Sequence, residues 1–495
     1  MLKVSRVCNV LMRQLYGNYI HNMKKKGRGR TSRQRRRKFR TSESSKVSES
    51  HKLEFIELRK WLKERKFEDH NLRPTRFSGT GRGLMAVKSL QPGELIISLP
   101  EECLLTTDTV IKSYLGDYIT KWTPPISPLL ALCTFLISEN NAGNKSPWKP
   151  YLDILPKDYT CLVCLEPRVV RLLPKPLKIK AQEQKAQVQE LFVSSRGFFS
   201  SLQSLYTENV EHIFHYHAFL WAWCTINTRT VYMKHAQKKC LSAEPDVYAL
   251  APYLDLLNHS PGVQVNAAFN EKTRCYEIRT TSSYKKYEEL FICYGPHDNH
   301  RLLLEYGFVA INNPHSAVYV SIDSLVDHLP SMDTQMNKKL SLLKEHGFSD
   351  LFWLVSSSGL PFGEVITRVM LASNPVQFLT FSMNLTFGWD GPSWRLLTAL
   401  KLLCLGADEF TCWKKVLLGE VISDTNEWKS LVLSRKICSS FIEETKTALQ
   451  KISHMKDEET ALKDQLTLVE NLWVEELTLL QVSADILKNM HQETT

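Results

Sequence analysis

Apolar residues recur at helical spacing in the segment that follows residue 47. Phe55, Leu58 and Leu62 are separated by charged residues, and a period of three to four residues places all three on one face of a helix. Ser48 and Ser50 precede this run, and serine hydroxyls accept hydrogen bonds from the first N–H groups of a helix. The pattern predicts an amphipathic helix that one of these two serines caps.

Between residues 71 and 100 the pattern changes to short apolar runs that alternate or contain β-branched residues. Gly79, Gly81 and Gly83 interrupt these runs, and so does a Gln-Pro-Gly-Glu turn at residues 91–94. Runs of this length between glycines and turn residues are typical of strands. We predict a small β-meander for this segment.

Strand patterns return after residue 250. Residues 265–281 predict a hairpin with its turn at residues 270–273, and residues 289–295 predict a buried strand that ends at Gly295. Residues 110–250 and the chain from residue 325 onward have helical periodicity, with breaks marked by Pro124, Pro125 and Pro128. The order is β, long helical insertion, β and a helical C-terminal part, which predicts an α+β fold.

The net charge of +11 is concentrated in one segment. Residues 24–40 hold eleven Lys and Arg and no acid, which leaves 52 basic against 52 acidic residues elsewhere. Such a run cannot bury enough apolar surface to offset its ordering entropy, so residues 1–47 are predicted to be a disordered basic tail. We interpret it as a nuclear-localisation signal or anionic-surface tether, or as a solubilising extension. Residues 1–23 are either a weak transit peptide or an extension ahead of an alternative start at Met23.

Cysteine usage favours a reducing compartment. The twelve Cys are not arranged in pairs, no signal peptide is apparent, and a chain of this length does not need disulfides. Only Cys161 and Cys164 form a C-x-x-C, without the second pair of a zinc site, so free thiols are favoured over a metal. His212, His215 and His217 lie in an aromatic helical segment, where packed histidines are commoner than ligands. No apolar stretch approaches the roughly 20 residues of a membrane span, which argues against membrane insertion.

Three short segments combine residue types that bind ligands. Residues 79–84, Gly-Thr-Gly-Arg-Gly-Leu, precede an extended run instead of the helix of a dinucleotide site, so a plain turn and a ligand loop both remain open. Residues 253–260 form an apolar run that ends in Asn258 and His259, where the amide either binds a polar ligand or caps the local backbone. Tyr294 lies directly before the glycine that ends the predicted strand, and such a phenol either packs in the core or faces a cavity.

The three segments occur in the order G-x-G-L with a Q-P-G-E turn, then D-L-x-N-H, then E-E-L-F-I-x-Y-G. Together they resemble the SET methyltransferases. The long insertion, and a helical C-terminal part in place of a cysteine-rich zinc segment, resemble the Rubisco large-subunit methyltransferase class. The resemblance covers most of residues 50–495. It implies S-adenosylmethionine as the cofactor, protein substrates with histone tails among the candidates, and no metal.

The resemblance also implies roles for single residues. Tyr294 matches the catalytic tyrosine, and Phe308 falls where the class lines its narrow lysine channel. Arg82 occupies a position where the class also has bulky apolar residues, so the resemblance carries over its backbone role and not a stacking role of its side chain. The residues implied to bind the cofactor are Thr80, Gly81, Arg82, Arg229, Asp255, Asn258, His259 and Tyr306.

The resulting fold prediction is a split β-rich SET domain with a threaded, pseudoknot-like N-H segment, a long helical insertion and an all-helical C-terminal substrate-binding domain. The expected units are the basic tail (1–47), the N-terminal helix with the first SET segment (48–110), the helical insertion (111–250), the second SET segment with the catalytic strand (251–312) and the C-terminal domain (313–495).

Most of the class methylates lysine, so the resemblance implies a protein-lysine N-methyltransferase that acts on histone or non-histone lysines. One branch methylates histidine, which leaves a protein-histidine methyltransferase as an alternative. A catalytically silent SET-fold binding module is another. We expect nucleic acid contact only through the basic tail, and localisation in the nucleus and the cytoplasm.

Overall fold

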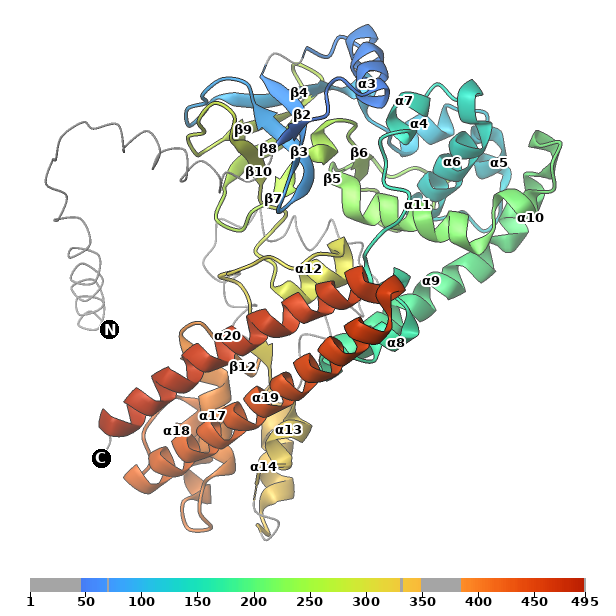
Figure 1. Cartoon of the computed structure of the whole chain (residues 1–495). Coiled ribbons are helices and arrows are strands. Elements are labelled where there is room, and N and C mark those ends of the chain that lie inside the picture. The colour runs from blue at the N-terminus through green and yellow to red at the C-terminus, as the bar shows by residue number, and fades with distance from the viewer. Residues whose placement is uncertain (1–45, 69–70, 330–332, 349–383, 494–495) are drawn as a thin grey trace, which may run out of the picture.

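The computed structural model describes residues 46–68, 71–329, 333–348 and 384–493. In Figure 1 these residues form a β-rich lobe, a group of helices beside it, and an elongated C-terminal lobe built along two long helices. Nearly all of the predicted basic tail lies outside the described residues. Within them, no helix is both long enough and apolar enough to span a bilayer.

The first helix, α3 (Leu53–Glu64), confirms the amphipathic pattern. Phe55, Leu58 and Leu62 are buried in the largest apolar core, and their charged neighbours face solvent. Burial of three large apolar side chains on one face stabilises a helix whose isolated sequence would be marginal in water.

The predicted serine cap is wrong. The N-cap of α3 is Lys52, whose side chain makes no capping hydrogen bond. Ser48 lies in strand β1 (Val47–Ser48), where it pairs with Thr75, and its hydroxyl is 2.8 Å from the hydroxyl of Ser50. The chain is still extended at this point because the strand pairing holds it, and the two hydroxyls bond to each other instead of to the helix.

One five-stranded sheet, in the order β1-β2-β3-β10-β7, brings the three ligand-type segments together. Strand β10 pairs antiparallel with β3 and parallel with β7. It ends three residues before the predicted end, and of its residues only Leu290 is fully buried. The four strands that follow β1 are β2 (Leu72–Phe77), β3 (Gly81–Ala86), β7 (Asn258–His259) and β10 (Glu289–Ile292).

A second sheet has the order β4-β9-β8. Strands β8 (Val265–Asn270) and β9 (Cys275–Thr280) form the predicted hairpin. The predicted meander is only half correct, because β4 (Leu95–Pro100) does not pair with β3 and instead pairs antiparallel with β9. Periodicity identifies a strand, but its partner is chosen by packing against residues far away in the chain.

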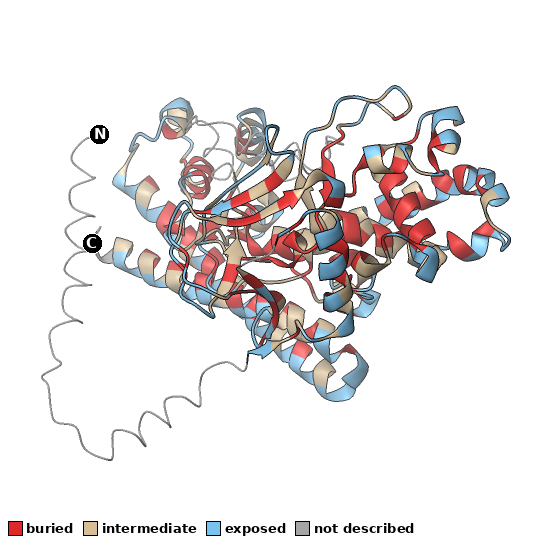
Figure 2. Ribbon diagram, turned by 90° about the horizontal axis from the view of Figure 1, so that it is seen from above, coloured by how far each residue is buried: buried red, intermediate tan, exposed pale blue. Residues whose placement is uncertain are grey.

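The insertion is helical up to Arg229. Helix α6 starts at Pro128 with the Ser127 hydroxyl accepting from the N–H of Leu130, and eleven of its fifteen residues are buried. In Figure 2 buried residues, in red, gather in the interior of the molecule, and exposed residues, in pale blue, lie at its outside. The helices are α4 (Thr107–Ile111), α5 (Gly116–Lys121), α6 (Pro128–Ala142), α7 (Lys149–Leu152), α8 (Pro167–Val170), α9 (Lys175–Ser201), α10 (Val210–Ile213) and α11 (Tyr216–Arg229).

Residues 230–250, the last part of the expected insertion, are not helical. Strands β5 (Thr230–Tyr232) and β6 (Tyr248–Leu250) pair antiparallel directly after α11. Thr230 and Val231 begin this hairpin, and β-branched residues favour extended backbone over helix. The helical prediction for residues 230–250 is therefore corrected.

The C-terminal part is helical, as predicted, and it also holds a small three-stranded sheet that the all-helical prediction did not include. Its strands span only two or three residues, too few for a period to be recognised. They are β11 (Val318–Tyr319), β12 (Thr386–Gly388) and β13 (Gly391–Pro392). The described helices that follow β10 are α12 (Asn299–Tyr306), α13 (Ile322–Val326), α14 (Met336–Glu345), α17 (Trp394–Leu403), α18 (Trp413–Leu417), α19 (Asp424–Glu458) and α20 (Lys463–Glu493).

A third apolar core ties the C-terminal helices to the rest of the molecule. Leu303 and Leu304 of α12 pack in one cluster with Leu177 of α9 and Leu472 of α20. Beside this cluster, the His300 ring lies 2.6 Å from the carboxylate of Glu476, with both side chains buried. Helix α12 is thus fixed from both sides, and this fixes the position of the residues at its C-terminal end.

Candidate active site

The ends of strands β7 and β10 lie at the same edge of the sheet because the two strands are parallel. Tyr294 follows β10 by two residues. Its N–H donates to Nδ1 of His259 over 3.0 Å, and its hydroxyl donates to the carbonyl of Leu257 over 2.8 Å. Two hydrogen bonds from one tyrosine therefore connect the third ligand-type segment to the second.

Aromatic rings surround Tyr294. Its ring centroid lies 5.1 Å from that of His259, 5.0 Å from that of Tyr306 and 6.3 Å from that of Phe308. Tyr306 ends α12, and Gly307 follows at φ +76°, a left-handed conformation that turns the chain so that Phe308 also faces the group. Burial raises the pKa of the Tyr294 phenol to about 12, which keeps it protonated at neutral pH.

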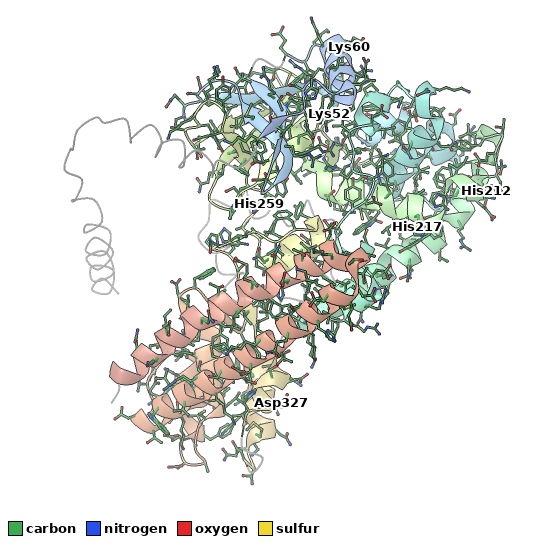
Figure 3. The ribbon with its side chains drawn as sticks, viewed as in Figure 1. Lys52, Lys60, His212, His217, His259 and Asp327 are labelled. Atoms are coloured by element: carbon green, nitrogen blue, oxygen red, sulfur yellow. The ribbon has the colours of Figure 1, made fainter. Side chains whose placement is uncertain are left out.

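His259 is an uncharged ring at neutral pH. Burial, with a smaller effect from His315, lowers its pKa to about 4. Because Nδ1 accepts from the N–H of Tyr294, the proton of the neutral ring resides on Nε2. Figure 3 shows His259 between the β-rich lobe and α12, at the junction with the C-terminal lobe.

The glycine segment is joined to Asn258 through a carboxylate that the sequence analysis did not identify. The amide of Asn258 donates to the carbonyl of Arg82 over 2.9 Å and to Glu289 Oε1 over 2.8 Å. The hydroxyl of Thr80 donates to the same carboxylate over 2.7 Å. Burial raises the pKa of Glu289, although these two hydrogen bonds oppose the shift. The only indication in the sequence was the position of Glu289 in a carboxylate pair ahead of an apolar run.

Gly81 and Gly83 have different roles in this contact. Gly81 is at φ +78° and a Cβ there would meet no atom within 4 Å, so the backbone is open on this side. A Cβ on Gly83 would come within 2.7 Å of Glu289 Oε1 and 2.8 Å of Asn258 Nδ2. Gly83 is therefore required for the close approach of Asn258 to the strand.

Arg229 and Asp255 form a buried ion pair at the base of the site. The Arg229 Nη1 donates to Asp255 Oδ2 over 3.1 Å and to its carbonyl over 3.2 Å, and the hydroxyl of Tyr151 donates to Oδ2 over 3.0 Å. Burial alone would lower the pKa of Arg229, but the charge and hydrogen bond of Asp255, together with Tyr159 and Tyr151, outweigh burial and raise the pKa. Nothing in the local sequence around Tyr151 predicted its place here, because the contact spans 104 residues.

The side chain of Arg82 is part of the same electrostatic group. Burial lowers its pKa, and the positive charge of Arg229 acts in the same direction, whereas Asp255 opposes both. The charges of Arg229 and Asp255 thus act on the Arg82 guanidinium in opposite directions.

A cavity of about 580 Å³ lies beside the glycine segment. Thr80 and Glu289 line it, together with Tyr284 and Phe291, whereas Tyr294 does not. Glu289 thus both lines this cavity and accepts a hydrogen bond from the amide of Asn258.

Two groups of residues that the sequence analysis considered as metal ligands are not part of the site. Cys161 and Cys164 lie near Cys224 instead of near a second pair. His212 is 71% exposed, and His215 caps α11 by accepting from the N–H of Ala218. Figure 3 places His212 and His217 at the far end of the insertion. Among the described residues, no group of three or more His, Cys, Asp or Glu could hold a metal ion.

The chain matches two family models, the SET domain over residues 81–295 and the Rubisco LSMT substrate-binding domain over residues 330–480. It is 65% identical to SET domain-containing protein 4 from Homo sapiens, over 95% of this chain and 100% of that protein. This chain belongs to the SET domain-containing protein 4 family. The recognised resemblance and the predicted fold class are both confirmed by these matches.

The names of more distant SET proteins refer to different amino acids, histidine in one case and lysine in another. An actin-histidine N-methyltransferase from Drosophila melanogaster is 25% identical over 57% of this chain and 54% of its own length. A crystal structure described as the SET domain of LSMT bound to lysine and AdoHcy aligns with a TM-score of 0.56 and 18% identity, over 89% of this chain and 93% of that chain. The last comparison establishes that the SET fold is shared.

The residues of this SET domain fit S-adenosylmethionine, the expected cofactor. In the described part of the chain, Arg229 Nε, Asp255 Oδ1 and His259 Nε2 are buried and have no hydrogen-bond partner. Unpaired buried polar atoms are costly, so they usually mark a place that a polar ligand or water satisfies. Two donors and an acceptor suit the carboxylate, amine and hydroxyl groups of such a cofactor, and the open backbone at Gly81 offers further partners.

Proposed function

We propose that the chain is a protein-lysine N-methyltransferase that uses S-adenosylmethionine. Membership of a SET family and the shared fold support a methyl-transfer enzyme. The observation that carries the proposal is the placement of Tyr294, whose phenol bonds to the carbonyl of Leu257 among the rings of His259, Tyr306 and Phe308.

The cofactor would be held by groups from all three ligand-type segments. We assign it to the backbone around Thr80, Gly81 and Arg82, to Asn258 and His259, and to the Arg229–Asp255 pair, with Tyr306 at its edge. When bound, S-adenosylmethionine supplies an electrophilic methyl group on a sulfonium. The buried ion pair and the fixed dipoles of Asn258 provide a preorganised polar environment for that charge.

The aromatic residues would prepare the amine. A lysine amine has a reference pKa of about 10.4 and is mostly charged in water, and a narrow ring-lined channel lowers that value by desolvation. Phe308 and Tyr306 supply such walls, and the lost proton leaves to solvent. The phenol of Tyr294 then orients the neutral amine for in-line displacement, in which the N–C bond forms as the C–S bond breaks.

Lysine is proposed over histidine as the acceptor, with histone and non-histone proteins as the substrate class. The solved structure whose title names a lysine supports this choice, and the actin-histidine relative supports the alternative. The match of residues 330–480 to a substrate-binding domain supports assigning residues 313–495 to recognition of a protein partner. The basic segment at residues 24–40 supports a nuclear as well as a cytoplasmic location.

In the test, the full-length protein is supplied with S-adenosylmethionine that carries a deuterated methyl group. It is incubated with histones and, separately, with an extract of cells whose proteins carry few methyl groups. Mass spectrometry of the products identifies the modified residue. We expect label on lysine side chains, and at least tenfold less label when Tyr294→Phe replaces the wild type. Label on histidine would replace the lysine proposal with the alternative. If the wild-type protein binds the cofactor tightly but labels neither the histones nor the extract, it is a silent binding module instead.

A further inference from the structure

Three cysteines from two distant segments meet next to helix α12. Cys161 directly precedes a short 3-10 turn (Leu162–Cys164), Cys164 is the last residue of that turn, and Cys224 lies in α11. The sulfur atoms of Cys164 and Cys224 are 3.5 Å apart, and the Cys161 thiol also interacts with that of Cys224. The proposed methyl transfer uses none of these thiols.

The surroundings of the three thiols differ. Cys161 is buried and its thiol donates to the carbonyl of Glu305 over 3.7 Å, so it is engaged with α12. Cys224 is fully buried, whereas Cys164 is partly exposed. A small oxidant from solvent therefore reaches Cys164 first. The hydrogen bond from Cys224 lowers the pKa of Cys164, which favours the thiolate, the reactive form of the side chain.

We propose that Cys164 is a peroxide-reactive residue and that it forms a reversible disulfide with Cys224. In the first step the Cys164 thiolate attacks hydrogen peroxide, which gives a sulfenic acid and hydroxide. In the second step the Cys224 sulfur attacks the sulfenic acid, the S–S bond forms, and the oxygen leaves as water with the Cys224 proton. Two electrons pass from the two thiols to one peroxide. A cellular thiol such as glutathione reverses the reaction by exchange.

The local structure allows the two sulfurs to approach. An S–S bond is about 2.05 Å long, so the sulfurs must move closer by about 1.5 Å. Cys224 is held in a buried helix, but the turn that carries Cys164 is a single three-residue element between loops. The turn can therefore provide most of the movement.

The turn is also in contact with the site. Ahead of it, the hydroxyl of Tyr159 lies 2.8 Å from that of Thr225 in α11, and the hydroxyl of Thr160 donates to the carbonyl of Gly307 over 2.7 Å. Helix α11 ends at Arg229, and Gly307 lies between the site residues Tyr306 and Phe308. A bond from Cys164 to Cys224 would thus fix the segment that supports both sides of the site.

The experiment treats the full-length protein with one equivalent of hydrogen peroxide under native conditions, blocks free thiols with N-ethylmaleimide and analyses tryptic peptides. We expect a linked pair of peptides, residues 158–168 with residues 197–229, that is lost after dithiothreitol. Because residues 158–168 contain both Cys161 and Cys164, variants assign the bond. The link should persist in Cys161→Ser and disappear in Cys164→Ser.

Two further variants guard against a folding artefact. In Cys224→Ser, Cys164 should stop at the sulfenic acid and be captured by dimedone. Cys240 is partly exposed like Cys164, and Cys240→Ser should leave the linked pair unchanged. The proposal is overturned if Cys164 stays fully alkylated after peroxide, if it pairs with Cys161 or with a second chain, or if the link survives in Cys164→Ser. Because no outcome depends on methyl transfer, failure here is distinct from failure of the proposed function.

Discussion

The hydroxyl of Tyr294 donates a hydrogen bond to the carbonyl of Leu257, with 2.8 Å between the two oxygens. Leu257 directly precedes Asn258 and His259, so this bond fixes the phenol relative to the residues assigned to the cofactor. The ring is also held by its neighbours, with centroids of His259 and Tyr306 at 5.1 and 5.0 Å. The phenol is therefore held in one orientation, and a group that orients an amine must be held in this way.

Tyr294→Phe should lower the rate of methyl transfer at least tenfold, by about 1.4 kcal/mol or more. The ring remains and keeps its contacts, but the hydroxyl that orients the amine is lost. Radiolabelled methyl transfer measures the rate, and isothermal titration of S-adenosylmethionine should give an unchanged affinity. As a control, Tyr118→Phe removes a hydroxyl that bonds only to Ser204 on the exposed surface. Equal rates for all three proteins would remove Tyr294 from the mechanism.

Gly83→Ala should weaken cofactor binding at least tenfold. The new Cβ would lie 2.7 Å from Glu289 and 2.8 Å from Asn258, which must then give up the hydrogen bond between them or move apart. Gly79→Ala is the matched control, since a Cβ there meets nothing within 4 Å. Titration with S-adenosylmethionine compares the two variants. If both bind like the wild type, Asn258 is not a cofactor ligand.

Asp255→Ala should lower the free energy of unfolding by about 3–5 kcal/mol, because it leaves the Arg229 guanidinium buried without a counter-charge. The Asp255 side chain is 0% exposed and that of Arg229 is 16% exposed. The Lys149–Asp153 pair, at 38% and 42%, is a control, and Asp153→Ala should cost at most about 1 kcal/mol. Urea denaturation followed by circular dichroism measures both. Similar losses in the two variants would contradict a special role for the buried pair.

The free energy of unfolding should fall as the pH drops from about 6.5 to about 4, and His259 should be one cause. Burial lowers the folded-state pKa of His259 to about 4, while the unfolded ring titrates near about 6.5. Over this window the unfolded state binds the proton and the folded state does not, so acid favours unfolding. The contribution is on the order of 3 kcal/mol at most.

The variant His259→Asn isolates this contribution. An asparagine oxygen takes the place of Nδ1 as acceptor for the N–H of Tyr294 and does not titrate. Denaturation at pH 7 and at pH 4.5 should show a smaller difference between the two conditions in the variant than in the wild type. His297, whose pKa burial also lowers, remains in both proteins and gives the residual slope. An unchanged slope would mean that folding does not lower the pKa of His259.

Peroxide treatment should lower methyl transfer several-fold, and dithiothreitol should restore it. Movement of the turn at Cys164 is transmitted through Thr160 to Gly307, and small displacements of positioning groups have large effects on rate. Cys164→Ser, which lies outside the proposed catalytic machinery, should keep its rate under the same treatment. A parallel loss in wild type and variant would place the oxidation damage elsewhere. This prediction depends on both the proposed methyl transfer and the proposed disulfide between Cys164 and Cys224.

Local patterns predicted local structure well. The face of α3 with Phe55, Leu58 and Leu62 and the turn between β8 and β9 depend on residues close in the chain, and both were confirmed. The partner of β4 and the cap of α3 depend on distant strands, and both were predicted wrongly. Periodicity reports which side of an element is buried, but it carries no information on what covers that side.

In the candidate site, too, features that depend on residues close in the chain were predicted and features that depend on distant contacts were not. The three ligand-type segments supplied Asn258, His259 and Tyr294, and the structure brings these together. Glu289 and Tyr151 escaped notice because their importance lies in what they touch, Asn258 in one case and Asp255 in the other. The functional roles of all these residues, and the threading of the N-H segment, stay predictions.

The pairing of β3 with β10 has a consequence for synthesis of the protein. Leu84 pairs with Leu290, so β3 leaves the ribosome long before its partner. At about 5–20 residues per second the delay is on the order of 10 to 40 seconds. During that time the hairpin of β2 and β3 has an unpaired edge, which invites association with other chains. Until residue 292 has emerged, the nascent chain thus has a strand edge for a chaperone to protect.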